Sequence, residues 1–351
     1  MEPRSGAPGR ARAGGVTSSP VRFRAASMGD AAAVAALVRE RELIDRGMCE
    51  TTVAAVRAQW TAPGVELAVD AVVGELDGRV VCGALATRDR EYAYVAPDHE
   101  GRGLGSRLLR WVMARTVARG AVRHMQIVGS GNAAAAALLQ RAGYERARSW
   151  RRMGMALDDE PAAAATCAGG AARCAGGAAS SAGGAASSAV RIRAIDAAGD
   201  AHELHRLDAA AFADNADYEP EPFEEFCDEH LRADDFDPAA SLAATDGERI
   251  VGYLLGARRR RGVGHVSVLG VDPTVRRRGV ATLLLRGAFA IWRAHGIGQA
   301  ELTVASDNPG AERLYRQLGM EVVFTQDCYE RPLESQRKGA YLEHGASSAL
   351  D

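Results

Sequence analysis

The stretch from residue 265 to residue 294, HVSVLGVDPTVRRRGVATLLLRGAFAIWRA, decides the fold of this protein. It begins as an apolar strand, turns at Asp272-Pro273, continues as a basic loop and ends in an apolar helix. Three arginines in the loop precede Gly279, where the helix begins. Glycine lets a ligand approach the backbone closely, and the unpaired N–H groups of a helix start favour an anion. This combination of charge and backbone is typical of a pyrophosphate site.

The sequence contains an earlier copy of this unit, AYVAPDHEGRGLGSRLLRWVMA, at residues 93–114. Four pairs of landmarks are each separated by 176 residues: Pro97 and Pro273, Gly103 and Gly279, Asn132 and Asn308, Gly143 and Gly319. A constant offset without gaps indicates an internal duplication. Strands that alternate with helices in both copies predict an α/β (α+β) protein with mixed sheets, and a ligand site where the strands splay.

The repeat and the composition predict five segments. We expect a disordered leader over 1–20, an N-terminal domain over 21–158 and a C-terminal domain over 190–335. Between them, AGGAA recurs at 168, 175 and 182, which predicts a flexible Ala/Gly/Ser-rich linker over 159–189. Residues 336–351 are expected to form a loose tail.

Local patterns predict the elements of each domain. Helices are expected at about 30–45, 51–60, 133–142, 201–211 and 309–318, besides the two that follow the glycine loops. Strands are expected at 21–24, 67–73, 79–86, 124–128, 190–193, 241–244, 249–255 and 301–305. A closing pair of strands is expected in each half, over 144–157 and over 320–331.

Composition limits the partners and the compartment. The 351 residues are 47% hydrophobic and 25% charged, with a net charge of −2, which argues against nucleic acid as a general partner. The arginine run at 258–261 is expected to be a solvated turn or strand end. No apolar run approaches the ~20 residues of a membrane span, and the first twenty residues lack the apolar part of a secretory signal. Six cysteines without a CxxC predict a reducing, cytoplasmic setting with neither disulfides nor a metal site.

A second motif follows the glycine loop of the C-terminal half by about thirty residues. R-x-x-G-x-A at 276–281 and N-x-x-A-x-x-L-Y-x-x-x-G-M at 308–320 together resemble the two signature motifs of the GNAT N-acetyltransferase superfamily. The resemblance covers residues 21–157 and 190–333, and it is specific in the second half and partial in the first. The loop lacks the Lys-Ser/Thr of a nucleotide-binding P-loop.

The resemblance implies that acetyl-CoA, used as cosubstrate, lies in a V between two splayed central strands. Asn308 would lie near the pantetheine arm and Tyr315 near the thiol. The pantetheine amides would pair with Leu269, Gly270 and Val271. The pyrophosphate would lie on the backbone of Arg276, Arg277, Arg278, Gly279, Val280, Ala281 and Thr282.

Transfer of an acetyl group to a primary amine of a small molecule or peptide needs a free amine and a proton for the departing thiolate. A lysine-like amine with a pKa of about 10.4 is only roughly one part in 2,500 neutral at pH 7, so a base or a water relay is required. Tyr315 is the candidate acid, and a core tyrosine at helical spacing is the alternative. His265, four residues before Leu269, stands where family members often place a glutamate base; the alternative is a structural histidine.

The N-terminal copy departs from the pattern at two positions. Glu100 replaces Arg276, and Leu139 replaces Tyr315. The candidate cofactor-binding residues that persist are Arg102, Gly103, Gly105 and Asn132. We therefore expect this half either to bind CoA weakly or only to support its partner, and we expect the chemistry in the C-terminal half.

The tandem arrangement also resembles the mycothiol synthase family, which acetylates an amino-sugar-linked cysteine. VLGVDP at 268–273 and FDP at 236–238 fit that resemblance, whereas His265 replaces the glutamate of that family and residues 254–260 lack its aromatic-basic pattern. The acidic segment 219–225 could supply carboxylates to a cationic acceptor or form a solvated face. A non-catalytic protein that binds acetyl-CoA or a partner is the alternative to an enzyme.

Overall fold

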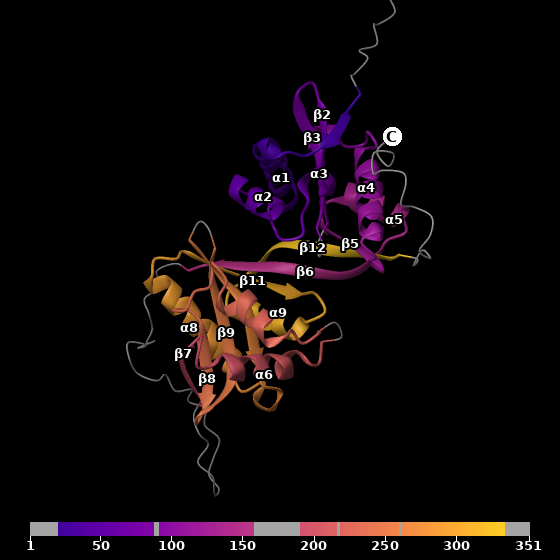
Figure 1. Cartoon of the computed structure of the whole chain (residues 1–351). Coiled ribbons are helices and arrows are strands. Elements are labelled where there is room, and N and C mark those ends of the chain that lie inside the picture. The colour runs from indigo at the N-terminus through magenta and orange to yellow at the C-terminus, as the bar shows by residue number, and fades with distance from the viewer. Residues whose placement is uncertain (1–19, 88–90, 158–189, 216–217, 260–261, 334–351) are drawn as a thin grey trace, which may run out of the picture. The chain divides into compact units, whose positions relative to one another are not determined.

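The computed structural model describes residues 20–87, 91–157, 190–215, 218–259 and 262–333 (Figure 1). The expected linker and tail, all of the expected leader but Pro20, and two arginines of the 258–261 run lie outside the described residues. The chain divides into two compact units. The first unit holds the chain up to Ala147 and from Cys328 onward, and the second unit holds Arg148–Asp327.

The first unit is built on an antiparallel sheet with the strand order β1-β2-β3-β4. Apolar side chains of α1 and α2 pack on one face of the sheet, and those of α4 pack on the other. The elements are β1 (Arg22–Ala25), α1 (Ala31–Arg46), α2 (Val53–Trp60), α3 (Leu67–Asp70), β2 (Ala71–Leu76), β3 (Arg79–Ala86), β4 (Glu91–Val95), α4 (Leu104–Ala118), β5 (Arg123–Gly129) and α5 (Ala133–Arg141).

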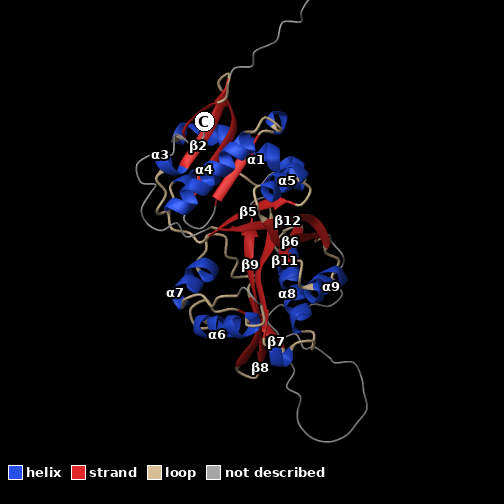
Figure 2. Cartoon of the chain, turned by 90° about the vertical axis from the view of Figure 1, so that its right-hand side faces the viewer, coloured by secondary structure: helices blue, strands red, loops and turns tan. Residues whose placement is uncertain are grey.

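The second unit is built on a mixed sheet with the order β6-β11-β10-β9-β8-β7, in which β10 and β11 are parallel. Figure 2 shows α6 and α7 on one side of this sheet and α8 and α9 on the other. The elements are β6 (Glu145–Ala156), β7 (Arg191–Ala194), α6 (Ala201–Phe212), α7 (Phe223–Phe226), β8 (Leu242–Asp246), β9 (Arg249–Arg259), β10 (Val263–Val271), α8 (Val280–Ala294), β11 (Gln299–Ala305), α9 (Pro309–Gln317) and β12 (Glu321–Pro332).

The limits of the compact units differ from those of the repeat because the last strand of each half continues from one unit into the other. Strand β6 begins in the first unit, and its residues from Arg148 belong to the second. Strand β12 begins in the second unit, and its residues from Cys328 belong to the first. Each is one uninterrupted strand, so the expected closing pair of strands in each half was wrong. Neither segment contains the turn that a hairpin would need.

A second expectation was wrong at the start of β2. Residues 67–70, expected as part of a strand, form the short helix α3. The carboxylate of Asp70 accepts a hydrogen bond from the N–H of Glu66 at 2.8 Å, and it pairs with Arg119 at 2.7 Å. This buried carboxylate closes a helical turn, and the local contact outweighs the strand preference of the sequence.

The core of the second unit forms around Trp292 of α8, which is fully buried. Gly264 of β10 lies under this ring, since an added Cβ would come within 2.3 Å of it. The indole N–H donates to the buried carboxylate of Asp237 at 3.0 Å, and Arg258 pairs with the same carboxylate at 2.8 Å. The FDP segment and the first arginine of the 258–261 run therefore have structural roles here.

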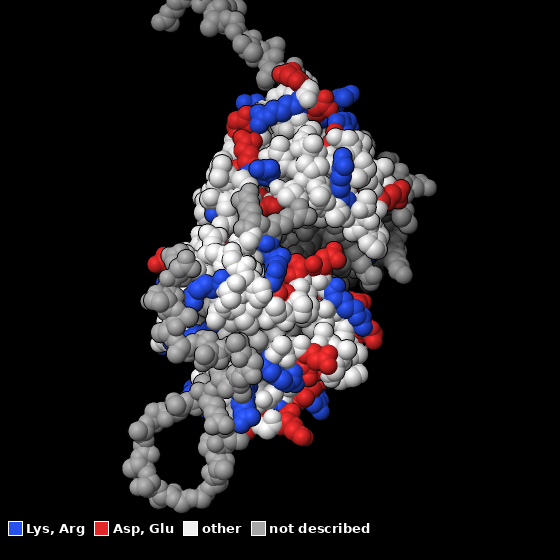
Figure 3. Space-filling view, turned by 90° about the vertical axis from the view of Figure 1, so that its left-hand side faces the viewer, with Lys and Arg blue, Asp and Glu red and all other residues white. Residues whose placement is uncertain are grey.

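Charged residues of both signs are interspersed on the face shown in Figure 3. Among the described residues, no helix has the length and apolar character needed to cross a membrane.

Candidate functional site

The two central strands of the second unit separate at the middle of the sheet. The ladder between β10 and β11 runs from the Val263–Gln299 pair to the Val266–Leu302 pair and ends there. Beyond this point β10 continues along β9, and β11 continues along β6. The ends of these two parallel strands are therefore not paired with each other, and this interruption of the ladder is called the opening below.

A β-bulge marks the point where the opening begins. The register between β10 and β9 shifts between Val266 and Val268, so that Ser267 is the extra residue. Further on, the N–H of Asp272 donates to the carbonyl of Val251 in β9. Because amide groups alternate sides along a strand, those of Leu269 and Val271 point away from β9 and toward the opening, whereas those of Gly270 point toward β9. Two of the three residues expected to pair with pantetheine thus present backbone groups to it.

The loop after β10 has an unusual backbone. Arg277 and Gly279 both have positive φ, 62° and 83°, and the matching residues of the first half, Gly101 and Gly103, have φ of 74° and 78°. The duplication is therefore visible in the backbone itself. A positive φ is uncommon for a residue with a side chain, so Arg277 holds a conformation that the N-terminal copy reaches with glycine.

Helix α8 begins directly after this loop, at Val280, and no side chain caps its start. The first N–H groups of a helix have no intrahelical acceptor, and together with the helix dipole they attract an anion. Arg276, Arg277 and Arg278 are exposed beside this helix start. The carboxylate of Asp272 fixes the loop by accepting from the N–H and the hydroxyl of Thr274, at 2.9 and 2.6 Å, and these bonds lower the pKa of Asp272.

The guanidinium of Arg276 is directed to α6 in this structure. It pairs with the carboxylate of Asp214 at 2.7 Å and donates to the carbonyl of Ala211 at 2.7 Å. Arg276 therefore ties the loop to the end of α6. Its backbone remains part of the loop that leads into the uncapped helix.

The motif after β11 supplies Asn308 and Tyr315. The side-chain oxygen of Asn308 accepts from the N–H of Ala311 at 3.0 Å and caps α9, while its amide N–H₂ has no partner among the described residues. Tyr315 lies on α9 and is 8% exposed. Burial raises the pKa of its phenol to about 12, and within the described chain the hydroxyl makes no hydrogen bond. Tyr315 is thus a protonated donor whose hydrogen is not bound by any residue that the structure describes.

His265 lies on the other face of the sheet. Its neighbour Gly264 faces Trp292 of α8, so His265 points to the face that carries α6 and α7. The side chain is 5% exposed, and its Nδ1 is buried without a hydrogen-bond partner within the described chain. Burial, reinforced by Arg259 and Arg152, lowers the pKa of His265 to about 3, so the imidazole is neutral at physiological pH. Tyr315 and His265 therefore belong to opposite faces of the sheet that contains the opening.

The acidic segment 219–225 pairs largely with its own neighbours. Glu221 lies 3.4 Å from His230, and Glu224 lies 3.2 Å from Arg232. Possible ligand atoms of Glu221, Glu229 and His230 lie within 4.8 Å of one another. These local pairs favour the interpretation of the segment as a solvated face.

In the N-terminal half, charged side chains of α1 contact the start of the glycine loop and the residues that follow β5. Arg41 of α1 bonds to Glu100, which begins the glycine loop, and also to Asp45, at 2.6 Å. Asp45 in turn accepts from the amide of Asn132 at 3.3 Å, and it packs against Gly129 at the end of β5. The side-chain amide of Asn132 therefore donates to Asp45, whereas the matching amide of Asn308 has no partner among the described residues.

Other residues of this half also differ from the C-terminal pattern. Leu139, which replaces Tyr315, is buried against Leu109, Tyr144 and Tyr329. Arg102 and Gly103 are exposed in the loop, and an added Cβ at Gly105 would meet Leu138 at 3.0 Å. Gly105 is thus explained by the packing of α4 on α5.

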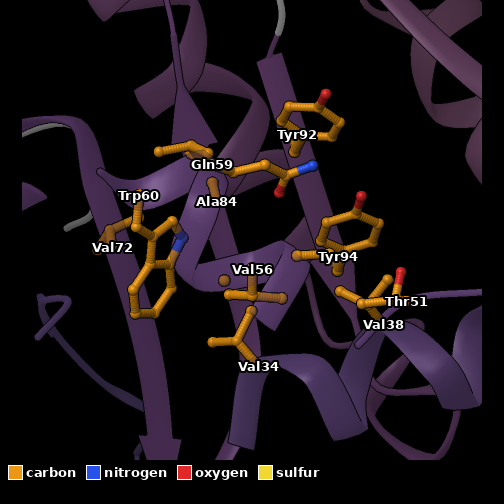
Figure 4. Close-up of a pocket in the computed structure, with 13 residues that line it drawn as sticks. Val34, Val38, Thr51, Val56, Gln59, Trp60, Val72, Ala84, Tyr92 and Tyr94 are labelled. Carbon is orange, nitrogen blue, oxygen red and sulfur yellow. The ribbon is translucent and has the colours of Figure 1, made fainter. Parts of the chain in front are cut away.

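The first unit contains a cavity of about 60 Å³ on the face covered by α1 and α2. Figure 4 shows Trp60 on one side of it and the stacked rings of Tyr92 and Tyr94 on the other, with Gln59 between them. The remaining lining is mostly aliphatic. No sequence motif marks this cavity, because its walls come from several separate segments of the first unit.

The residues of the second unit fit acetyl-CoA. An uncapped helix start beside exposed arginines suits a pyrophosphate, and the backbone groups of Leu269 and Val271 that point to the opening suit the pantetheine amides. The side-chain amide of Asn308 and the hydroxyl of Tyr315, which no described residue binds, complete the set. Sequence reasoning missed Ser267 and Asp214, because the bulge at Ser267 depends on the pairing of β10 with β9, and Asp214 contacts Arg276, which lies 62 residues further along the chain.

Comparisons with known proteins identify the family of the chain. The model of the Acetyltransferase (GNAT) family matches residues 45–144 and 201–320. A mycothiol acetyltransferase of Geodermatophilus obscurus is 30% identical over 304 residues, which are 82% of this chain and 90% of the relative. The mycothiol acetyltransferase of Thermobifida fusca is 30% identical over 285 residues, with 76% and 83% covered.

Two solved structures share the fold. A GCN5-related N-acetyltransferase from Sphaerobacter thermophilus superposes with a TM-score of 0.72 at 24% identity, covering 89% of this chain and 95% of that chain. A tandem GNAT protein from the clavulanic acid biosynthesis pathway superposes with a TM-score of 0.61 at 16% identity, covering 91% and 100%. With both family matches, the splayed strands and the repeated loops in place, the chain belongs to the GNAT family of acetyltransferases, as a two-domain N-acetyltransferase.

Proposed function

We propose that the protein transfers the acetyl group of acetyl-CoA to a primary amine of a small molecule or peptide, and that the chemistry takes place in the C-terminal half, residues 190–335. One difference between the halves carries this proposal. In the C-terminal half no described residue binds the side-chain amide of Asn308 or the hydroxyl of Tyr315, whereas in the N-terminal half the amide of Asn132 donates to Asp45 and leucine replaces the tyrosine.

The backbone and the loop would hold the cosubstrate. The first N–H groups of α8, with Arg277 and Arg278 beside them, would bind the pyrophosphate, and Leu269 and Val271 would bind the pantetheine amides. The thioester supplies an activated acetyl group. Backbone N–H groups at 269 and 271, which point toward the opening, would polarise its carbonyl.

Two side chains would accept and donate the protons of the reaction. A new C–N bond forms as the C–S bond breaks, so the attacking nitrogen must lose a proton and the departing sulfur must gain one. Nδ1 of neutral His265, which has no protein partner within the described chain, would receive the first proton, directly or through water. Tyr315 would donate to the sulfur, because burial keeps its phenol protonated.

The pKa of His265 also limits which amines can react. An imidazole with a pKa of about 3 cannot remove a proton from a free ammonium group with a pKa near 10. The acceptor must therefore enter as a neutral amine, or have an amine pKa that its own structure lowers. An α-amine beside a carbonyl or a thiol meets this condition better than a lysine side chain.

The test is acetyl-CoA-dependent thiol release with a panel of amines. The panel includes lysine-like amines, amino sugars and cysteine-linked amino sugars, the last because the relatives are mycothiol acetyltransferases. We expect release to depend on one class of acceptor and to stop in Asn308→Ala. CoA binding without release for any acceptor would instead favour a non-catalytic binding protein.

A further inference from the structure

The closing strand of the N-terminal repeat is part of the unit that contains the candidate site. Residues 150–156 of β6 pair with β11 along its whole length, from Gln299 to Ala305. Strand β11 is one of the two strands that flank the opening. Two consecutive arginines of β6, at 151 and 152, point to opposite faces of the sheet because side chains alternate along a strand.

Arg152 reaches the face on which His265 lies. Its guanidinium pairs with Glu301 of β11 at 3.0 Å, and it lies over the ring of Phe324 at 5.2 Å. Glu301 is the register partner of His265 across the β10–β11 ladder. The side chains of Arg152 and Glu301 are only 11% and 9% exposed, so this ion pair lies in the interior beside His265.

Arg151 reaches the opposite face, where α9 packs. Its guanidinium pairs with Glu312 of α9 at 2.7 Å. Glu312 lies one helical turn before Tyr315, and it also binds Arg316 of the same helix. Arg151 thereby joins β6 to the helix that carries the candidate acid.

We propose that Arg151 and Arg152 are positioning residues of the C-terminal acetyltransferase site, contributed by the N-terminal repeat. Arg151 holds α9 and thus Tyr315, and Arg152 holds Glu301 and sets the charge around His265. This inference rests on the proposed function of Tyr315 and His265. It gives the N-terminal half a role in catalysis that requires no chemistry of its own.

The charges around His265 make the role of Arg152 measurable. The described charged groups near this imidazole are Arg259 of β9, Arg152 of β6 and Glu301 of β11. Both arginines lower the pKa of His265, and Arg152 also neutralises Glu301. Removal of Arg152 takes away one positive charge and leaves a buried carboxylate unpaired, so the pKa of His265 must rise. Loss of Arg151 has no such effect.

The experiment compares Arg151→Met, Arg152→Met and their Lys counterparts in the full chain, with Arg191→Met as the exposed control. We expect Arg151→Met to lower kcat by about tenfold with the KM for acetyl-CoA changed less than twofold, because misplacement of a reacting group costs rate more than binding. Arg152→Met should move the acid limb of kcat/KM to higher pH. The two Lys variants should recover most of the wild-type behaviour, and Arg191→Met should match the wild type.

Two measurements that need no activity separate this inference from the proposed function. In NMR titrations, the His265 imidazole should not titrate between pH 5 and 8 in the wild type, and its pKa should be higher in Arg152→Met than in the wild type. Amide exchange in α9 should be faster in Arg151→Met than in the wild type. If Arg152→Met does not fold, Arg152→Gln keeps a hydrogen-bonding group beside Glu301, removes the same positive charge and should raise the pKa of His265.

The inference would be overturned if the His265 pKa were unchanged in Arg152→Met and amide exchange in α9 were unchanged in Arg151→Met, even in an active enzyme. A wild-type protein that releases no thiol with any amine would instead overturn the proposed function, and the NMR and exchange results would still decide whether the arginines hold these two elements.

Discussion

Replacement of Tyr315 by phenylalanine removes one hydroxyl and little else. The ring packs in the core of the second unit with Val304 and Met320, and phenylalanine retains that packing. The hydroxyl makes no hydrogen bond within the described chain, so its loss leaves no buried group unpaired. We therefore expect the free energy of unfolding to change by less than about 1 kcal/mol.

The expected effect on the rate follows from the charge that develops on sulfur. A hydrogen bond to an ionised partner contributes about 1.5–3 kcal/mol, and each 1.36 kcal/mol is a factor of ten in rate. Loss of the Tyr315 hydroxyl should thus lower kcat by about 10- to 150-fold. Because the pKa of Tyr315 is about 12, the phenol is protonated from pH 6 to 9, and the loss should be the same throughout that range.

The assay is thiol release at saturating acetyl-CoA and amine, together with single-turnover measurements in case product release limits kcat. CoA affinity by calorimetry should be unchanged. Tyr329→Phe is the matched control, because Tyr329 is equally buried but belongs to the first unit. A single-turnover rate within twofold of the wild type would remove Tyr315 from the mechanism.

Three further predictions follow from the described contacts. Gly279→Ala and Gly296→Ala each place a Cβ in open space but at a positive φ, 83° and 72°, so each variant should lose about 1 kcal/mol of stability. Only Gly279→Ala should weaken CoA binding in calorimetry. Equal CoA affinities of the two variants would contradict a phosphate site at Gly279. CoA should bind the full chain at one site, because Arg41 and Asp45 occupy the corresponding place in the N-terminal half, and two sites of similar affinity would refute this. Burial lowers the pKa of His124 to about 4, so as pH falls below 6.5 the imidazole is protonated in the unfolded state before it is protonated in the folded state. The free energy of unfolding, measured in denaturant titrations, should therefore drop by on the order of 2 kcal/mol between pH 7 and 5. His124→Asn should reduce that drop.

The sequence predicted the architecture well where a pattern repeats. The 176-residue offset aligned the two glycine loops, and the structure gives both the same sequence of positive φ angles. Most helices fell within a few residues of their expected limits, because apolar periodicity and the capping residues Thr52, Asn132 and Asn308 are local signals.

The exchange of closing strands could not be predicted from the sequence. The last strand of each half has the same apolar pattern whichever neighbour it pairs with, so periodicity does not identify the partner. The contacts of Arg151 and Arg152 with Glu312 and Glu301 join residues about 150 positions apart, and no local motif marks them.

The candidate site was predicted in part. Motif spacing located Asn308, Tyr315 and the loop. The structure adds that the side-chain amide of Asn308 and the hydroxyl of Tyr315 make no hydrogen bond to a described residue. It directs the side chain of Arg276 to Asp214, a contact that depends on the end of α6. For His265, an ordinary pKa of 6.5 was the natural expectation, but burial and two arginines change it, and these follow only from tertiary packing.

The strand that crosses from one compact unit into the other has a consequence for how such a tandem protein can evolve. Under the proposed function, mutations that erase coenzyme contacts from the N-terminal copy would be tolerated as long as its final strand persists. Deletion of that copy would leave β11 as an unprotected sheet edge prone to aggregation. The duplicate can therefore lose its own chemistry and still be selected for the strand that it gives to its partner half.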